Sequence, residues 1–208
     1  MIPVDTIITF FTASALLALV PGPDNIFVLT QSALSGRSAG IVVMLGLCTG
    51  LLFHSAAVAM GVAVIFQTSV LAFTILKMVG AGYLAWLAWQ AFRARGSELQ
   101  SSGQERINHG RLYRRGIIMN ITNPKVSIFF LAFLPQFADP ARGPISLQIL
   151  MLGGLFIIST ILIFGGIALL AGSLGRLLNR SPRIQTIMNR VAGVVFLGLA
   201  LKLVTTEQ

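Results

Sequence analysis

Long apolar stretches constrain this chain more than any other feature. Six of them, each long enough to span a bilayer, which takes roughly 17 to 25 residues, run near 6–34, 39–66, 75–92, 116–137, 146–171 and 187–204. Only 10% of the residues are charged, whereas a soluble domain carries about a quarter. The sequence therefore predicts an all-α integral membrane protein with six transmembrane helices.

The first and fourth stretches contain residues that are unusual in a membrane helix. PGPDN occupies 21–25, and NITNPK occupies 120–125. Proline removes a backbone donor and clashes with the preceding turn, and glycine allows conformations that other residues resist. Such irregular backbone is tolerated at membrane depth only where protein or a water-filled cavity surrounds it. The residues predicted to interrupt the two helices are Pro21, Gly22, Pro23 and Pro124.

Weak similarities, in the same order, relate the two halves of the chain. Pro23-Asp24 corresponds to Pro124-Lys125, Met-Leu-Gly recurs at 44–46 and 151–153, and 77–84 aligns with 190–197. Each half holds three apolar stretches, so the second half enters the membrane from the opposite side. We therefore predict two inverted three-helix repeats, at 1–92 and 116–208, joined by a cytoplasmic linker at 93–115.

The basic residues predict the orientation. Eleven arginines lie in the segments after the first, third and fifth stretches, whereas the opposite side holds only Arg142 and Lys202. Because basic loops stay in the cytoplasm, both termini are expected on the periplasmic side. The net charge of +9 is explained by these loops and indicates no nucleic-acid partner.

Two ionisable residues lie deep in the predicted membrane segments. At 1.5 Å per residue, Asp24 lies roughly 16 Å and Lys125 roughly 14 Å from the cytoplasmic ends of their helices. A charge at the bilayer centre costs on the order of 3 kcal/mol, so it is retained for a partner or a purpose. A carboxylate, an ammonium and two half-helix N-termini together complement a zwitterion such as an amino acid. Two structural alternatives stay open: Asp24 as a helix N-cap, or an Asp24–Lys125 ion pair with no substrate between them.

Other polar residues accompany these charges. His54 follows Gly46 and Gly50 at four-residue spacing, so the glycines predict close helix contact, and His54 serves either a structural hydrogen bond or proton movement. The predicted substrate-binding and coupling residues are Asp24, Asn25, His54, Asn120, Asn123 and Lys125. We expect no catalytic residue, metal site or cofactor, and the lone Cys48 excludes an internal disulfide.

Four stretches of the sequence carry a family resemblance: LVPGPDNIFVLTQSALSGRSAG, GLLFHSAAVAMG, LKMVGAGYLAWLAWQAFR and YRRGIIMNITNPKVSIFFLAFLPQF. With them, essentially the whole chain resembles the LysE/RhtB family of amino-acid exporters. The sequence is more similar to the homoserine/threonine and neutral amino-acid branch. The resemblance implies a bacterial inner-membrane protein that expels amino acids or close derivatives by proton antiport. The family's motifs match residues 21–25 and 123–125 without giving each residue a role.

The expected function is therefore secondary export, with an amino acid and protons as partners and the substrate bound between the interrupted helices. A passive solute channel is one alternative. A membrane-embedded enzyme or lipid-handling protein is another, but it would need a nucleophile or metal cluster, which the sequence does not indicate. Glycine stripes serve contacts within a protomer as readily as between protomers, so a homo-oligomer also stays open.

Overall fold

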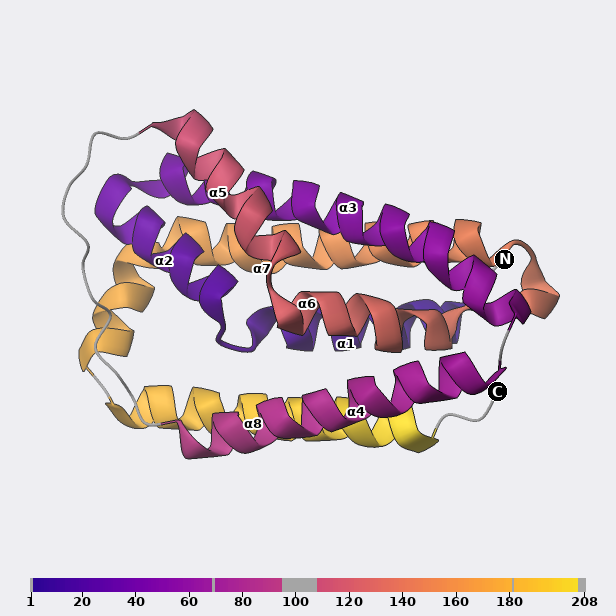
Figure 1. Cartoon of the computed structure of the whole chain (residues 1–208). Coiled ribbons are helices and arrows are strands. Elements are labelled where there is room, and N and C mark those ends of the chain that lie inside the picture. The colour runs from indigo at the N-terminus through magenta and orange to yellow at the C-terminus, as the bar shows by residue number, and fades with distance from the viewer. Residues whose placement is uncertain (1, 69, 95–107, 181, 206–208) are drawn as a thin grey trace.

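The computed structural model describes residues 2–68, 70–94, 108–180 and 182–205, which form a bundle of long helices (Figure 1). The elements, in order, are α1 (Val4–Leu19), α2 (Pro23–Ser35), α3 (Arg37–Thr68), α4 (Val70–Arg93), α5 (His109–Ile121), α6 (Pro124–Ile128), η1 (Phe129–Phe133), η2 (Leu134–Phe137), η3 (Pro140–Arg142), α7 (Ile145–Arg180) and α8 (Pro182–Thr205).

Both predicted helix interruptions are confirmed. The axis bends by 60° between α1 and α2, and by 49° between α5 and the segment 124–137. Each bend begins where proline removes a backbone donor that a continuous helix would need. After the second bend the chain forms the short α-helix α6 and then continues as the π-helix η1 and the 3-10 helix η2. Pro135 lies in η2, so the last turns of this segment could not be regular α-helix.

Within the part of the chain that the structure describes, three helical segments are long and apolar enough to cross a membrane: Arg37–Gly61, Ile145–Ala171 and Gln185–Thr205. The count rises to five if each bent pair forms one span. The protein is thus a multi-pass membrane protein. The helix α4 is not among these five, so the sixth span at 75–92 stays a prediction.

The helices are longer than the apolar stretches that predicted them. The span predicted at 75–92 lies in a helix of residues 70–93, and the span predicted from 116 lies in a helix that begins at His109. Asn108 caps α5, because its side chain accepts a hydrogen bond from Arg111 N at 3.0 Å. Hydropathy marks only the apolar part of a helix, which polar residues extend at the membrane surface. Most of the predicted linker at 93–115 falls on residues 95–107, which lie outside the described residues.

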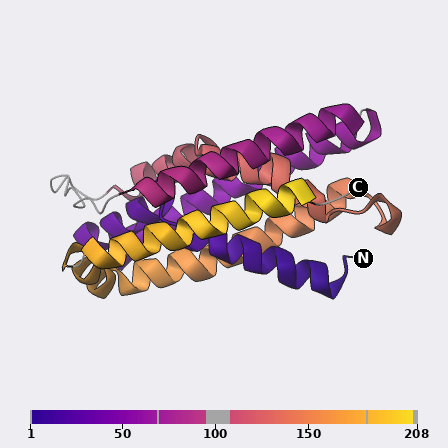
Figure 2. The same ribbon diagram turned by 90° about the horizontal axis from the view of Figure 1, so that it is seen from below.

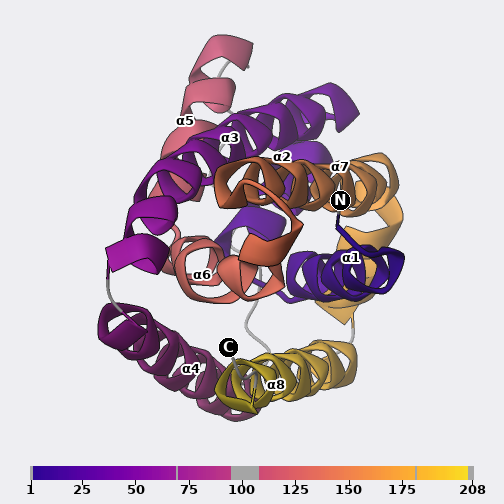
Figure 3. The same cartoon turned by 90° about the vertical axis from the view of Figure 1, so that its right-hand side faces the viewer.

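The two halves have the same element order: a broken helix, a long helix, and a further helix. In Figure 1 each helix of the second half runs opposite to its counterpart in the first, and both termini lie at one end of the bundle. Figures 2 and 3 show α4 and α8 side by side along one face. Opposite directions are what an inverted repeat requires, and the repeat itself stays a prediction.

The outer surface is apolar. Large hydrophobic side chains such as Leu52, Phe53, Met60, Leu162 and Val194 are more than half exposed. Exposing such an apolar surface to water is unfavourable, whereas contact with lipid tails is not. The described helices therefore present to lipid the kind of surface that a soluble protein buries.

Candidate functional site

The side chain of Lys125 lies at the break of the first helix. Lys125 comes from the start of α6, is only 7% exposed, and donates from Nζ to the carbonyls of Leu17 at 3.4 Å and Val20 at 3.2 Å. In a continuous helix the Leu17 carbonyl would accept from residue 21, which is Pro21 and has no N–H. The ammonium from the second half of the chain therefore satisfies a carbonyl that a proline in the first half leaves unpaired.

Asn25 completes the end of α1. Its amide nitrogen donates to the Ala18 carbonyl, one turn before the break. Gly22 is extended, with φ −162°, and a Cβ there would come within 3.0 Å of Lys125 Nζ. The glycine thus leaves room for the lysine ammonium to reach the open helix end.

Asp24 lies in the first turn of α2 and is 2% exposed. Its Oδ2 accepts a hydrogen bond from Asn120 Nδ2 at 3.4 Å, across the two halves of the chain. The N-cap of α2 is Gly22, without a side-chain capping bond, so the alternative in which Asp24 caps the helix is wrong. The hydrogen bonds of Lys125 Nζ go to backbone carbonyls and not to Asp24, so the two charges do not form a direct pair.

Asn123 caps the second half-helix. Its Oδ1 accepts from Lys125 N at 3.0 Å, and its carbonyl accepts from Val126 N at 3.1 Å. The first N–H groups of α6 are therefore already paired, which differs from the expectation that they are open to a substrate. The side-chain Nδ2 of Asn123 remains without a partner.

Unpaired polar atoms gather where the two breaks meet. Among the described residues, Asp24 Oδ1, Asn25 Oδ1, Asn120 Oδ1 and Asn123 Nδ2 are buried and make no hydrogen bond to the protein. Buried polar groups in folded proteins are nearly always paired, with protein, water or a ligand. Three acceptors and one donor in one cluster, beside an ammonium, can receive a small polar solute.

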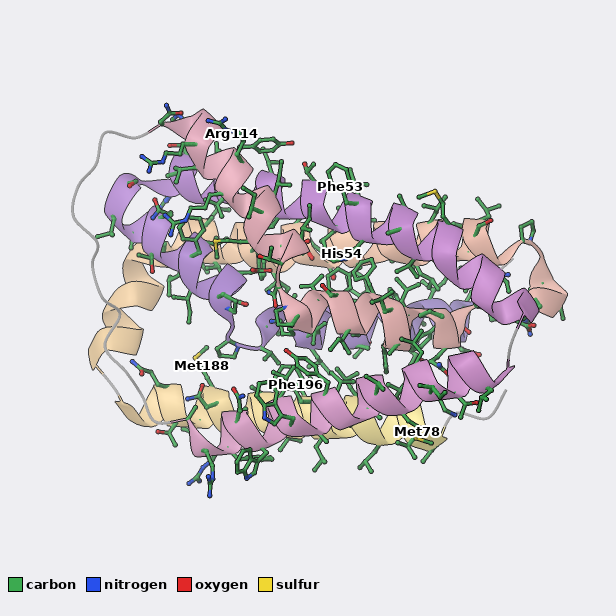
Figure 4. The ribbon with its side chains drawn as sticks, viewed as in Figure 1. Phe53, His54, Met78, Arg114, Met188 and Phe196 are labelled. Atoms are coloured by element: carbon green, nitrogen blue, oxygen red, sulfur yellow. The ribbon has the colours of Figure 1, made fainter. Side chains whose placement is uncertain are left out.

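His54 approaches the cluster from α3. Its Nε2 donates to the Asn120 carbonyl at 3.3 Å, and its ring lies 5.5 Å from that of Phe130. Figure 4 shows His54 directed toward the broken helix while the neighbouring Phe53 points outward. Gly50, one turn earlier, makes room for Asn120, because a Cβ there would lie 2.6 Å from its Oδ1.

The predicted close contact along the glycine stripe is confirmed. A Cβ at Gly46 would overlap the backbone carbonyl of Tyr113, and a Cβ at Gly116 would lie 2.6 Å from the Val43 carbonyl. The helices α3 and α5 therefore touch backbone to backbone. This contact fixes the position from which Asn120 reaches Asp24.

Two apolar clusters enclose the polar cluster along the bundle. On the side of the termini, an aromatic cluster contains Phe10, Phe129, Phe130, Phe133, Phe137 and Phe156. On the other side, a smaller cluster from α1, α2, α3 and α7 contains Ala18, Val28, Val43, Met44, Leu47 and Phe164. The polar residues at the breaks are thus separated from both ends of the protein by apolar packing.

The structure brings all six predicted site residues together: Asp24, Asn25, His54, Asn120, Asn123 and Lys125. Sequence reasoning missed the carbonyls of Leu17 and Val20. A signal for the first existed, since Pro21 stands four residues after Leu17 and cannot donate to it.

The family model of the LysE type translocator matches residues 15–207. A homoserine/homoserine lactone efflux protein of Salmonella typhimurium is 36% identical over 90% of each chain. A Vibrio cholerae protein named only as an uncharacterized membrane protein is 32% identical over 96% of this chain and 97% of its own. No solved structure matches. Because the family model covers nearly the whole chain, this protein belongs to the LysE type translocator family.

Proposed function

We propose that the protein is a secondary exporter that exchanges small amino acids, or close derivatives, for protons at the meeting point of the two helix breaks. The observation that carries this proposal is the buried cluster of Asp24, Asn25, Asn120 and Asn123, in which four polar atoms lack a protein partner. Membership of a translocator family supports transport, and the name of the Salmonella relative supports an amino-acid substrate.

The relative's two substrates suggest which group is recognised. Homoserine and its lactone both carry an ammonium, but only homoserine carries a carboxylate. The unpaired Oδ1 of Asp24 is the natural acceptor for the shared ammonium. Lys125 Nζ uses two of its three donors on carbonyls, so the third, with Asn123 Nδ2, can bind a carboxylate when the substrate has one.

Coupling follows from competition for Asp24. A proton and a substrate ammonium both bind its carboxylate, so one excludes the other. If the solute leaves on the outer side and a proton replaces it, the return of the empty site carries the proton inward. Each ligand drives this cycle only if its affinity differs between the inward-facing and the outward-facing state of the protein. His54 Nε2 donates to the Asn120 carbonyl, which leaves its Nδ1 to accept a proton next to the site.

The basic residues give the orientation that we propose for this cycle. The end of the bundle with Arg37 and the arginines of α5 lies on the cytoplasmic side of a bacterial inner membrane, and both termini lie on the outer side. The aromatic cluster then closes the outer path and the smaller cluster around Val43 and Leu47 closes the inner one. Inverted halves would let the two closures alternate around a fixed site.

Proteoliposomes loaded with homoserine test the proposal. An outward-directed substrate gradient with a pH gradient should drive efflux by the native protein and proton movement in the opposite direction. Asp24→Asn keeps the shape but loses the charge, and should abolish proton-coupled efflux while the protein remains folded. Glu105→Gln, which removes a carboxylate in the polar stretch 93–115, is the matched control and should transport normally.

Two results would contradict this function. Full proton-coupled efflux by Asp24→Asn would remove this carboxylate from the mechanism. Flux that depends only on the substrate gradient, with no proton movement in the native protein, would indicate a channel instead.

A further inference from the structure

The long helix α7 packs against both α1 and α2, and so passes the break between them (Figure 1). Its inner face carries large aromatic side chains on either side of this level. The Phe156 ring lies 5.2 Å from each of the rings of Phe129 and Phe130, in the aromatic cluster. Phe164 belongs to the smaller apolar cluster on the other side of the breaks. Midway between Phe156 and Phe164 the chain has Thr160, which is polar.

Thr160 lies at the level of the polar cluster. Residues four apart lie on the same face of a helix, so Thr160 shares a face with Phe156 and Phe164. Ile157, one turn before it, packs against both apolar clusters. The opposite face of α7 is turned to lipid, since Leu162 there is 61% exposed. Because the polar cluster lies between the two apolar ones along the bundle, Thr160 marks the part of α7 that borders it.

The hydroxyl of Thr160 is buried without a protein partner. The residue is 2% exposed, and its Oγ1 makes no hydrogen bond to any residue that the structure describes. A serine or threonine hydroxyl inside a helix ordinarily donates to the carbonyl three or four residues earlier. The hydroxyls that do so here include those of Ser14, Ser32, Thr49, Ser55 and Thr122. Thr160 departs from this pattern, so its surroundings must explain why.

The carbonyl that Thr160 would otherwise use is already occupied. The Phe156 carbonyl accepts a hydrogen bond from Ser159 Oγ at 2.8 Å, and the regular helix gives it the Thr160 N–H as well. A carbonyl oxygen has two lone pairs, so both are in use. The Thr160 hydroxyl therefore keeps a proton to donate, at the same level as the unpaired oxygens of Asp24 and Asn25. A buried group of this kind is normally paired with water or a ligand.

We propose that Thr160 Oγ1 donates to an oxygen on the substrate's side chain and makes the site selective for small amino compounds that carry one. This inference rests on the proposed function, because it needs the substrate to bind where the two helix breaks meet. Asp24 on α2 then binds the ammonium, and Thr160 on α7 binds the side chain. Phe156 and Phe164 flank the hydroxyl, so a charged side chain would lose its water there without gaining a partner. The preferred side chain is therefore uncharged.

Two ligands that differ by one hydroxyl test this assignment. Homoserine and 2-aminobutyrate have the same carbon chain, ammonium and carboxylate, but only homoserine carries the terminal hydroxyl. The Kd of each for the purified full-length protein is measured by competition with radiolabelled homoserine. The native protein should bind homoserine about tenfold more tightly than 2-aminobutyrate, which is the effect expected of one buried hydrogen bond.

Substitutions at position 160 should change the binding of one ligand and not the other. Thr160→Val keeps the branched shape but removes the hydroxyl, so it should weaken homoserine by that same factor and leave 2-aminobutyrate unchanged. Thr160→Ser keeps the hydroxyl and should keep the preference for homoserine. Ser14→Ala is the matched control. It removes a buried hydroxyl of α1 that already donates to the Phe10 carbonyl, so both Kd values should stay as in the native protein.

A further variant separates this inference from the proposed function. Both ligands carry an ammonium, so Asp24→Asn should weaken both by the same factor and leave the preference for homoserine intact. If Asp24→Asn behaves in this way but Thr160→Val still prefers homoserine as the native protein does, the role of Thr160 is overturned and the site at the breaks stands. Unchanged binding of both ligands by Asp24→Asn would overturn the site at the breaks, and the assignment of Thr160 with it.

Discussion

The Lys125 ammonium should stabilise the first helix break through one carbonyl in particular. Lys125→Met keeps the length of the side chain but leaves the carbonyls of Leu17 and Val20 without their donor. At the position where a continuous helix would supply a donor to the Leu17 carbonyl, the chain has Pro21, which has no N–H. Pro21→Ala restores an N–H at that position, so it should offset part of the damage.

The expected size of this coupling follows from the cost of an unpaired group. A buried acceptor without a donor costs about 1–3 kcal/mol. Lys125→Met should therefore destabilise the Pro21→Ala protein by about 1–3 kcal/mol less than it destabilises the native protein. Removing the buried charge itself also changes stability, but this contribution is the same in both backgrounds and cancels in the cycle.

Unfolding in mixed micelles with increasing dodecyl sulfate, followed by far-UV circular dichroism, measures the four free energies. Pro23→Ala is the matched control. Pro23 follows the extended Gly22, so its new N–H belongs to α2 and would not face the carbonyls that Lys125 binds; its coupling with Lys125→Met should stay within about 0.5 kcal/mol of zero. Equal couplings at Pro21 and Pro23, or none at Pro21, would refute the assignment of Lys125 to the Leu17 carbonyl.

Two further substitutions test the surroundings of the site. Gly50→Ala places a Cβ 2.6 Å from Asn120 Oδ1, so it should lower the free energy of unfolding by about 1–3 kcal/mol and cut efflux from proteoliposomes more than tenfold. Gly154→Ala has open space around it and should change neither quantity. Normal efflux by Gly50→Ala would argue against a role for Asn120. Phe129→Ala empties a fully buried position in the aromatic cluster, so it should lower the free energy of unfolding in detergent by about 3–5 kcal/mol. It should also raise the passive leak of homoserine from proteoliposomes. An unchanged leak would show that the cluster is not the outer barrier.

Much of the fold follows from the sequence because bilayer insertion restricts what a chain can do. The prolines of PGPDN and NITNPK predict the breaks on backbone chemistry alone. The matching order of the two halves predicts that the breaks face each other, and Asn120 does reach Asp24 across them. Gly46 and Gly50 predict the close contact of α3 with α5, because a residue without a side chain lets two helix backbones approach each other.

The parts that could not be predicted depend on which groups lose their partners in three dimensions. Two opposite charges at similar depth suggest a pair, but Lys125 serves backbone carbonyls, which a count of charged residues does not include. Asn123 satisfies the N–H groups that were expected to be open. The π-helical turns at Phe129–Phe133 depend on packing between segments far apart in the sequence.

The central claim is that a substrate ammonium and a proton compete for Asp24. The pH dependence of homoserine binding to the purified protein, measured from about pH 5 to about pH 8, tests this most directly, because the substrate keeps its ammonium over that range. The affinity of the native protein should rise with pH, since bound protons must leave before the ammonium can bind. Asp24→Asn should bind more weakly and lose most of the rise in affinity with pH. The same pH dependence in Asp24→Asn as in the native protein would contradict the claim.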